Sequence, residues 1–392
     1  MKKLILSTLA LTSISALAAP WNPYNNPRNF QRHFKGPMVS KLSSLPAQAK
    51  LSNVHYIWSD SYWPSMLGSV AYRWNAEPNA EEFKYKMYSK AELAKMSLTE
   101  LEKLSPAEKF DIYNGNYSYP FTKKVLSMFS PADLWWEGIC HGWSIAAVNH
   151  PEPKRVNLRN KDGIVVPFGS TDVKGLLSFY YGKVNKESDT FSQIGVSCKA
   201  LGKVEGEASP EDLHKEKPTQ AAASTPECQD TNAGAFHIVL TNMIGLSDTG
   251  LIAEVDRYND VWNQPVGEYS YEILGERAAT SAERSKGAVK IVEVKFAMTY
   301  ADEQNTHTTK ITPWEGSYAS MDPTTGTPEN NFHTREYQYT LELDSQGQII
   351  GGEWISESRP DYIWTKKSNN FSSGMFSLNM SSLKEIYRPV VD

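Results

Sequence analysis

Hydrophobic and polar positions predict short helices in the first half of the chain. Residues 78–112 have helical character, and Ser89 and Ser105, each followed three residues later by glutamate, indicate capped helix starts. From Cys140 onward, apolar or small residues recur at the spacing of one helix face until a proline ends the pattern. A further helix is predicted over residues 171–181.

Strands are predicted in the second half. The almost wholly apolar run 235–241 predicts a buried strand, and 251–256 a second one, with glycine, serine and aspartate between them as a hairpin turn. Beyond residue 288 hydrophobic residues alternate, and a change of phase near Ile291 indicates a β-bulge. The alternation resumes over 337–343 and leads into a turn and another strand. The pattern therefore predicts an α+β fold with a helical N-terminal segment and a β-rich C-terminal part.

The first residues indicate export. Residues 1–18 combine two lysines, a short apolar stretch and small residues, which is the form of a secretory signal peptide. Neither this stretch nor any later one is long enough to span a membrane. We expect a secreted or periplasmic protein with no integral membrane segment. The remainder divides into an N-terminal extended and helical region (19–125), a catalytic core (126–287) and a β-rich C-terminal region (288–392).

Composition narrows the choice of partners. A hydrophobic share of 40% and a charged share of 22% are ordinary for a folded globule. The net charge is −5 and no stripe of lysine and arginine is present, so nucleic acid is not an expected partner. No cluster of His, Cys and Asp has metal-ligand spacing. The sequence therefore requires no cofactor, although calcium or another divalent cation bound by scattered carboxylates is compatible with it.

The chain has three cysteines, so at least one is left out of any disulfide. Cys198 and Cys228 flank residues 199–227, a polar segment that predicts a surface loop. A disulfide closing this loop would contribute roughly 3–4 kcal/mol on the chain-entropy model. Cys140 would then be the free thiol, available for chemistry or simply buried and inert.

The sequence around Cys140 favours chemistry. In the string WWEGICHGW, a glycine-containing loop leads into the predicted helix, whose first turn carries the cysteine. The unpaired amides and the dipole of a helix N-terminus favour an anion, so we expect the pKa of this thiol to be lowered. The same amides can stabilise an oxyanion on an acyl group attached to the sulfur. Cys140 is therefore interpreted as a nucleophile.

A thiol nucleophile needs a base, and His237 is the candidate. An imidazole within an apolar strand is costly to bury without partners, although a core histidine bonded to the backbone is the alternative. His141 is adjacent to the nucleophile and points about 100° away from it on a helix. Asp256, across the predicted hairpin, would orient the imidazole, with Glu254 and Asp260 as alternative acids.

The order cysteine, histidine, aspartate is that of the papain-like and transglutaminase superfold. The strings WWEGICHGW, CQDTNAGAFHIVLTNMIG, EVDRYNDVWNQPV, LSPAEKFDIYNG and RPDYIW resemble the transglutaminase-elicitor family, known from oomycete plant pathogens and bacteria, over about residues 75–365. The resemblance implies a transglutaminase-type core, in which the nucleophile helix packs on an antiparallel sheet. It also implies protein-glutamine γ-glutamyltransferase activity, with Cys140 as nucleophile, His237 as base and Asp256 as orienting acid.

The implied reaction forms a cysteine thioester from peptide-bound glutamine. The acyl group then passes to a primary amine, such as a lysine of another protein, or to water, so glutamine- and lysine-containing proteins are the expected partners. Ordinary transglutaminases have tryptophan directly after the cysteine, where this chain has His141. Trp136 and Trp262 are therefore the candidates to hold the oxyanion, with plain packing as the alternative. Two other functions stay open: a papain-like secreted endopeptidase, and a non-catalytic exported binding protein.

Overall fold

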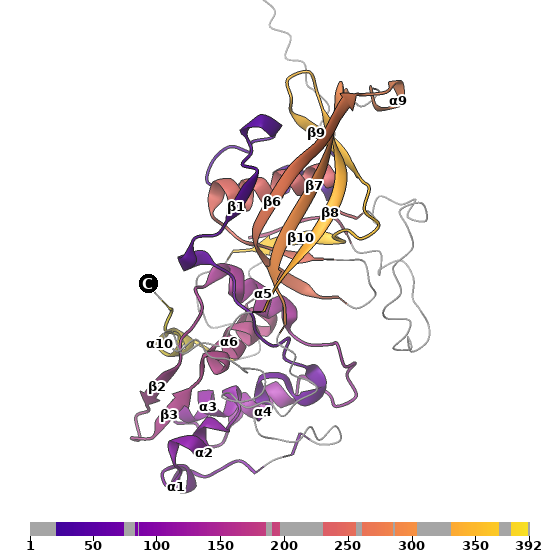
Figure 1. The fold of residues 1–392 in the computed structure, drawn as a ribbon. Helices are drawn as coiled ribbons and strands as arrows, with labels where there is room; N and C mark the ends of the chain where they lie inside the picture. The colour runs from indigo at the N-terminus through magenta and orange to yellow at the C-terminus, as the bar shows by residue number, and fades with distance from the viewer. Residues whose placement is uncertain are drawn as a thin grey trace, which may run out of the picture.

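The computed structural model describes residues 21–73, 83–84, 86–185, 190–196, 230–255, 261–284, 287–303, 331–367 and 378–390. Figure 1 shows short helices at one end of the molecule, an antiparallel sheet at the other, and helix α5 where the two meet. This confirms the predicted α+β class. Several predictions fall outside the described residues: the signal peptide at 1–18, the helix start at 78–82, the Cys198–Cys228 disulfide, Asp256 and Asp260.

The outer helices begin with the same cap. At Ser89, Ser97 and Ser105 the hydroxyl accepts the amide of a glutamate three residues on, and that carboxylate accepts the serine amide. The caps at Ser89 and Ser105 were predicted, and the one at Ser97 was not. The elements of this end are α1 (Lys90–Leu93), α2 (Leu98–Glu102), α3 (Pro106–Tyr113), α4 (Pro120–Leu126), α10 (Leu383–Ile386) and the ribbon of β2 (Val156–Arg159) with β3 (Val165–Phe168).

Two longer helices link this end to the sheet, α5 (Cys140–Asn149) and α6 (Ser170–Phe179). Both were predicted, and α6 continues as a π-helical turn, Tyr180–Val184. A fully buried ion pair ties α6 to α3, because Lys109 Nζ lies 2.7 Å from Asp172 Oδ2. Lys109 also donates to the Glu102 carbonyl, so both charges have the hydrogen bonds that burial demands.

The N-terminal segment clamps α5 at both ends. The indole of Trp58 donates to the carbonyl of His150 (2.9 Å), and the indole of Trp143 donates to the carbonyl of Trp58 (3.0 Å). At the start of the helix, the amide of Ile139 donates to the carbonyl of Tyr62 (2.8 Å). The segment that contains these contacts runs through short 3₁₀ turns, Pro23–Asn25, Pro27–His33, Leu42–Ser44, Asn53–His55, Ser65–Leu67 and Ser69–Ala71.

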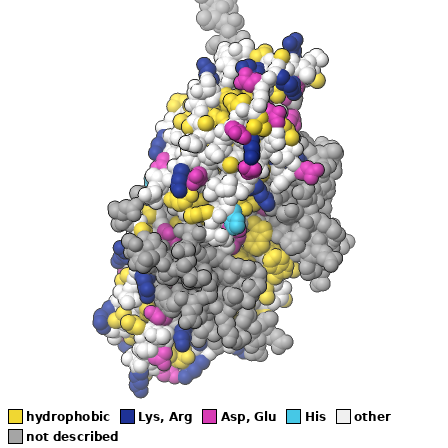
Figure 2. All heavy atoms as spheres, in the orientation of Figure 1, with side chains coloured by type: hydrophobic (Ala, Val, Ile, Leu, Met, Phe, Trp, Pro, Cys, Tyr) yellow, Lys and Arg dark blue, Asp and Glu magenta, His cyan; other side chains and the backbone are white. Residues whose placement is uncertain are grey.

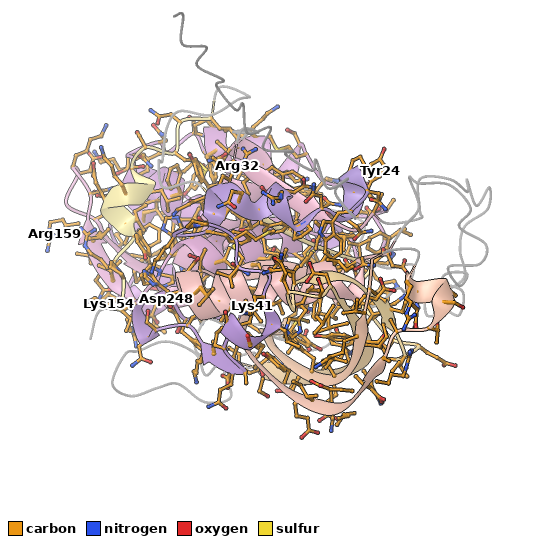
Figure 3. The ribbon with its side chains drawn as sticks, turned by 90° about the horizontal axis from the view of Figure 1, so that it is seen from above. Tyr24, Arg32, Lys41, Lys154, Arg159 and Asp248 are labelled. Carbon is orange, nitrogen blue, oxygen red and sulfur yellow. The ribbon has the colours of Figure 1, made fainter. Side chains whose placement is uncertain are left out.

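The sheet has the order β4-β10-β5-β6-β7-β8-β9, with β1 paired to β6, and its neighbours are antiparallel. Seen from above, its long strands curve strongly (Figure 3). On the part of the face in Figure 2 that is not grey, basic and acidic side chains are interspersed. The strands are β1 (Gln48–Lys50), β4 (Phe191–Ile194), β5 (Leu251–Glu254), β6 (Asn263–Ala278), β7 (Lys290–Ala301), β8 (Phe332–Leu343), β9 (Ile349–Trp354) and β10 (Tyr362–Lys366), and α9 (Ser281–Arg284) follows β6.

The alternation over 337–343 is confirmed, since Tyr337, Tyr339, Leu341 and Leu343 are all buried on β8. The bulge predicted near Ile291 is misplaced. The register between β6 and β7 shifts at 266–268 and at 273–275 on β6, whereas β7 pairs with β8 without interruption. The change of phase near Ile291 arises because this side chain packs in a small separate cluster at the far end of the sheet.

The strand predicted at 235–241 is wrong: these residues form helix α8 (Ala233–Leu240) and the start of a π-helical turn, Thr241–Leu246. Asn232 caps the helix, the whole helix is buried, and all of its side chains except His237 are apolar or absent. Such a run has no periodicity that separates a helix from a strand. The predicted hairpin is therefore also wrong, and β5 pairs with β6 and β10 instead.

Candidate functional site

Cys140 is the first residue of α5, as predicted, and its thiol is free and 7% exposed. The residue before it, Ile139, is the N-cap and makes no side-chain cap hydrogen bond. No side chain therefore caps the first turn, and the amides of Gly142 and Trp143 donate to the carbonyl of Ile139 at 2.8 and 3.1 Å.

The sulfur is bracketed by the start of strand β6. Asn263 Nδ2 lies 3.6 Å from Cys140 Sγ, and the thiol donates weakly to the carbonyl of Val261 at 3.9 Å. Trp364 of β10 fixes the asparagine, because its indole donates to Asn263 Oδ1 at 2.8 Å and so turns the amide nitrogen toward the sulfur. Asn263 and Trp364 are each 7% exposed, so this chain of hydrogen bonds is shielded from solvent.

Burial outweighs the helix terminus in setting the acidity of the thiol. Loss of solvation is the largest cause that raises the pKa of Cys140, the carboxylates of Glu303 and Glu254 raise it as well, and the hydrogen bonds from Asn263 lower it, which together give a pKa of about 11. The expected lowering of this pKa by the helix dipole is therefore not the net result. In this arrangement the thiol is protonated at neutral pH.

His237 does not lie at the thiol. It is fully buried on α8, where its Nδ1 is hydrogen-bonded to the hydroxyl of Tyr339 at 2.8 Å. The rings of Tyr271, Phe296 and Tyr339 surround it, with centroids 4.6 to 6.1 Å away. Burial lowers the pKa of His237 to about 3, so the imidazole is neutral.

The distance between Cys140 and His237 can be judged along strand β6, which both residues contact. Asn263, at one end, contacts the Cys140 sulfur, whereas Tyr271, eight residues further along, contacts His237. Eight residues of strand span roughly 25 Å. The prediction that His237 is the base for Cys140 is therefore wrong. The error follows from the strand-for-helix assignment, which placed the imidazole on a hairpin that does not exist.

The other predicted polar residues are distributed differently. Glu254, an alternative acid, is fully buried on β5 and near enough for its charge to act on the thiol, and it accepts the amide of Trp262 at 3.0 Å. His141 points to the carbonyl of Gly182 at 3.3 Å, in line with the helical geometry. In the described part of the chain, no histidine is hydrogen-bonded to the Cys140 sulfur.

A cavity of about 410 Å³ lies near the thiol, although Cys140 is not one of its lining residues. Trp262, which stands between the two residues that touch the sulfur, lines it, whereas Trp136 does not. The Trp262 ring packs edge-on against Tyr62 and tilts against Trp135. The remaining lining residues are Val255, Gln264, Tyr300, Asp302, Glu303, Asn331 and Arg335. Of the two predicted tryptophans, Trp262 is therefore the one that the structure places at the site.

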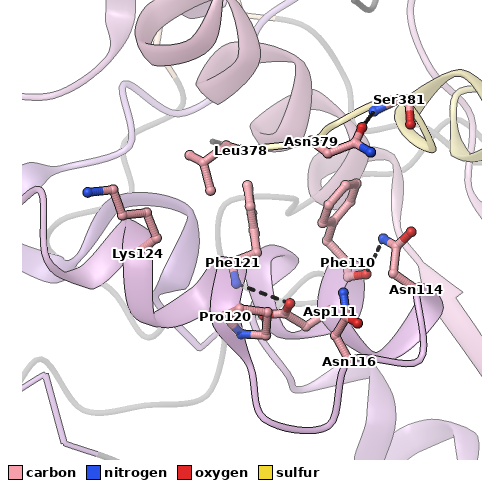
Figure 4. Close-up of a pocket in the computed structure, with 10 residues that line it drawn as sticks. All are labelled: Phe110, Asp111, Asn114, Asn116, Pro120, Phe121, Lys124, Leu378, Asn379 and Ser381. Atoms are coloured by element: carbon pink, nitrogen blue, oxygen red, sulfur yellow. Dashed lines mark hydrogen bonds between the residues drawn. The ribbon is translucent and has the colours of Figure 1, made fainter. Parts of the chain in front are cut away.

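A second cavity, of about 430 Å³, lies between α3, α4 and the C-terminal segment (Figure 4). Its buried carboxylate, Asp111, accepts the amides of Phe121 and Thr122 and so caps the start of α4. Burial raises the pKa of Asp111 to about 6. The described residues that line this cavity include no cysteine or histidine.

Sequence reasoning missed Asn263, Trp364, Gln264 and Glu303. The first three lie within or beside the strings that carry the family resemblance, but nothing in their spacing indicates that β10 and β6 meet at the nucleophile. The described residues contain no group of three or more His, Cys, Asp or Glu side chains that could hold a metal ion. In the same residues, no helix is both long and apolar enough to cross a membrane.

A cysteine at the start of a helix that packs on an antiparallel sheet is the arrangement of the papain-like and transglutaminase superfold, and comparison with known proteins identifies a transglutaminase-like protein. The model of the Transglutaminase elicitor family matches residues 133–386, more than half of the chain. The chain therefore belongs to this family. A solved structure, the GP42 transglutaminase from Phytophthora sojae, is similar in fold with a TM-score of 0.60 and 18% identity, over 93% of this chain and 97% of that one. No curated protein matches the chain.

Proposed function

We propose that the protein is an acyltransferase that forms a thioester between Cys140 and the side chain of peptide-bound glutamine. The acyl group then passes to a primary amine, which cross-links proteins, or to water, which deamidates the glutamine. The observation that carries the proposal is the sulfur itself: it stands at an uncapped helix start, receives an N–H from Asn263, and is contacted by the two residues that flank Trp262, which lines an aromatic-walled cavity.

Each group at the sulfur has a part in this reaction. The sulfur attacks the carboxamide carbon, and the first-turn amides and Asn263 Nδ2 donate to the oxygen that becomes negative. The proton of the thiol passes to the leaving nitrogen as the C–N bond breaks, so that ammonia departs, and an amine nitrogen then displaces the sulfur, which regains a proton from that amine. Trp262 and Trp135 screen the thioester from water, which favours the amine over hydrolysis. Trp364 is a positioning residue, because it acts through Asn263.

The setting of the reaction follows from the sequence. We propose that the protein is exported by its signal peptide, acts on glutamine- and lysine-containing proteins, and needs no cofactor for the acyl transfer. The Cys198–Cys228 disulfide and the role of Asp256 remain sequence predictions.

The test uses the mature protein with a glutamine-containing peptide and a primary amine. We expect ammonia release and amine incorporation, both lost in Cys140→Ala, with Ser127→Ala, an exposed serine, as the matched control. Trp364→Phe removes the indole donor while keeping an aromatic ring, and should lower turnover by about tenfold, since one oriented hydrogen bond is worth about 1 kcal/mol or somewhat more. Casein digestion without amine incorporation would identify an endopeptidase instead.

One observation favours a second candidate, a non-catalytic binding protein of the same fold. The thiol has a pKa of about 11, and none of the described histidines reaches it. A protein that neither releases ammonia nor cuts casein, but retains a glutamine-containing peptide equally well with Cys140 or Ala at position 140, would belong to this class.

A further inference from the structure

Strand β6 has an open edge in its last part, next to α9 and far from α5 (Figure 1). On the side away from β7, β5 pairs with residues 263–266 and β1 with residues 268–270. The amide of Tyr271 donates to the carbonyl of Ala47 at 2.8 Å, and the covered part of the edge ends there. In the described part of the chain no strand pairs with this side of residues 272–278, and all seven residues are exposed. Such an edge is a template for another strand.

The open edge carries apolar and charged side chains together. Ile273 and Leu274 are 48% and 46% exposed. Glu272 precedes this pair, and Glu276 and Arg277 follow it. Figure 2 shows apolar atoms among basic and acidic side chains at this end of the molecule. An apolar centre between charges of both signs has the composition of a specific protein contact.

A β-bulge decides which side chains of the edge share a face. The register of β6 against β7 shifts between Ile273 and Gly275, so Leu274 is the extra residue. In a regular strand Glu272 and Arg277, five residues apart, would point to opposite faces. Because of the bulge, their partners on β7 lie four residues apart, so the two charged side chains point to the same face.

The bulge also decides which backbone groups point outward. The amide of Tyr271 points to this edge, and because alternate residues of a strand do so, the amide of Ile273 does as well. Beyond the bulge, the amide of Ala279 points the other way, to the carbonyl of Val289, so Glu276, three residues earlier, points outward. Ile273 and Glu276 therefore offer their amides and carbonyls to a neighbouring strand.

We propose that this edge joins a second copy of the chain, with the two β6 strands antiparallel across a two-fold axis at the bulge. In this register Ile273 of each copy forms a hydrogen-bonded pair with Glu276 of the other. Glu272 of each copy stands opposite Arg277 of the other, so two pairs of opposite charge flank the axis. The proposal is independent of the proposed acyl transfer.

Charge and space select this register. A shift by one residue would oppose side chains that point to different faces. A register centred on Glu276 or on Arg277 would set like charges against each other. A register centred on Ile273 would run the second copy into Ala47, which already occupies the edge at Tyr271.

The charges of the edge are accessible to a second copy. Arg277 pairs with Glu283 of α9 at 2.8 Å, yet its side chain stays 51% exposed, and a guanidinium has five donors. A contact of this length is small against the roughly 1,200–2,000 Å² that stable complexes bury, so we expect a weak dimer that depends on concentration. Because β6 starts beside the thiol, the two Cys140 sites would lie at opposite ends of one joined sheet.

The test is sedimentation velocity of the mature protein over a range of concentrations, in which the wild type should self-associate. Glu272→Arg sets arginine against arginine and Arg277→Glu sets glutamate against glutamate, so each variant alone should weaken the dimer by about tenfold or more. An equal mixture of the two variants should associate again, because every charge then meets its opposite. The control, Glu336→Arg, reverses an exposed, ion-paired charge on β8 and should associate like the wild type.

Hydrogen exchange locates the contact. The amides of Ile273 and Glu276 should exchange more slowly as the concentration of the wild-type protein rises, and circular dichroism checks that each variant is folded. A protein that stays monomeric at every concentration would overturn the proposal, and so would a dimer that neither charge reversal weakens. Slow exchange of both amides in a monomer would mean that another segment of the same chain covers the edge, which also overturns it.

Discussion

Replacing His237 with leucine tests whether this histidine has a structural role or a catalytic one. The side chain is fully buried, bonded through Nδ1 to Tyr339, and enclosed by aromatic rings. Leucine keeps most of the volume of the histidine side chain. It cannot form the hydrogen bond that His237 makes with the buried Tyr339 hydroxyl. An orphaned buried hydroxyl costs about 1–3 kcal/mol. At pH 7.5 we therefore expect the free energy of unfolding of His237→Leu to be lower by about that amount.

The free energy of unfolding should also depend on pH, and the direction of this dependence follows from the pKa of His237. The pKa of His237 falls from 6.5 in the unfolded chain to about 3 in the folded protein. Between these values the unfolded state binds a proton that the folded state does not, so the wild-type protein loses stability as pH falls from 6.5 toward 3. Each pH unit is worth about 1.4 kcal/mol, so about 3 kcal/mol is lost by pH 4.5. The leucine variant has no titrating group at this position and does not lose this stability. The difference in the free energy of unfolding between the two proteins should therefore vanish or reverse at pH 4.5.

The assay is urea unfolding followed by circular dichroism at pH 7.5 and 4.5, with amine incorporation measured on the same samples. Tyr339→Phe is the matched control, and the double variant His237→Leu with Tyr339→Phe should recover part of the lost stability because both partners are gone. Turnover of the folded His237→Leu protein should stay within about twofold of wild type. A stable variant with no turnover would show that His237 acts at the sulfur after all.

Two further predictions follow from the environment of the thiol and from the packing of α8. The rate of alkylation of Cys140 should be low at pH 7 and should rise about tenfold per pH unit toward a pKa of about 11. A plateau of this rate below pH 8 would reveal an imidazolium partner that the described residues do not supply. Gly234→Ala should lower the free energy of unfolding by about 1–3 kcal/mol, because its Cβ would stand 2.4 Å from the carbonyl oxygen of Gly351. Gly275→Ala, where no atom lies within 4 Å of the added carbon, is the control, and equal losses in urea unfolding would contradict this reasoning.

Local signals in the sequence were reliable where one residue determines one contact. The serine caps at Ser89 and Ser105, the helix that starts at Cys140 and the alternation on β8 depend on neighbours in the chain, and all are present. Helix α8 was mistaken for a strand because it is buried on every side, so its apolar run carries no period. That single error also produced the wrong partner for the nucleophile.

The rest of the site depends on contacts that no local pattern encodes. Asn263 reaches the sulfur because β6 passes the start of α5, and Trp364 reaches Asn263 from a strand more than 100 residues further along the chain. The raised pKa of Cys140 likewise depends on how deeply the sulfur is buried and on Glu303 across the cavity. Charge, burial and distance of this kind come from tertiary packing and could not be deduced from spacing alone.

The clamp between the N-terminal segment and α5 has a consequence for how the protein is made. The family match begins at residue 133, yet Trp58 and Tyr62 supply carbonyls that hold the helix carrying the nucleophile. The unit that folds is therefore larger than the unit that the family pattern recognises. During synthesis the segment that contains Trp58 and Tyr62 cannot make these contacts until α5 has been translated. A protein shortened to residues 133–386 lacks them, so it should expose the Trp143 indole and aggregate rather than fold.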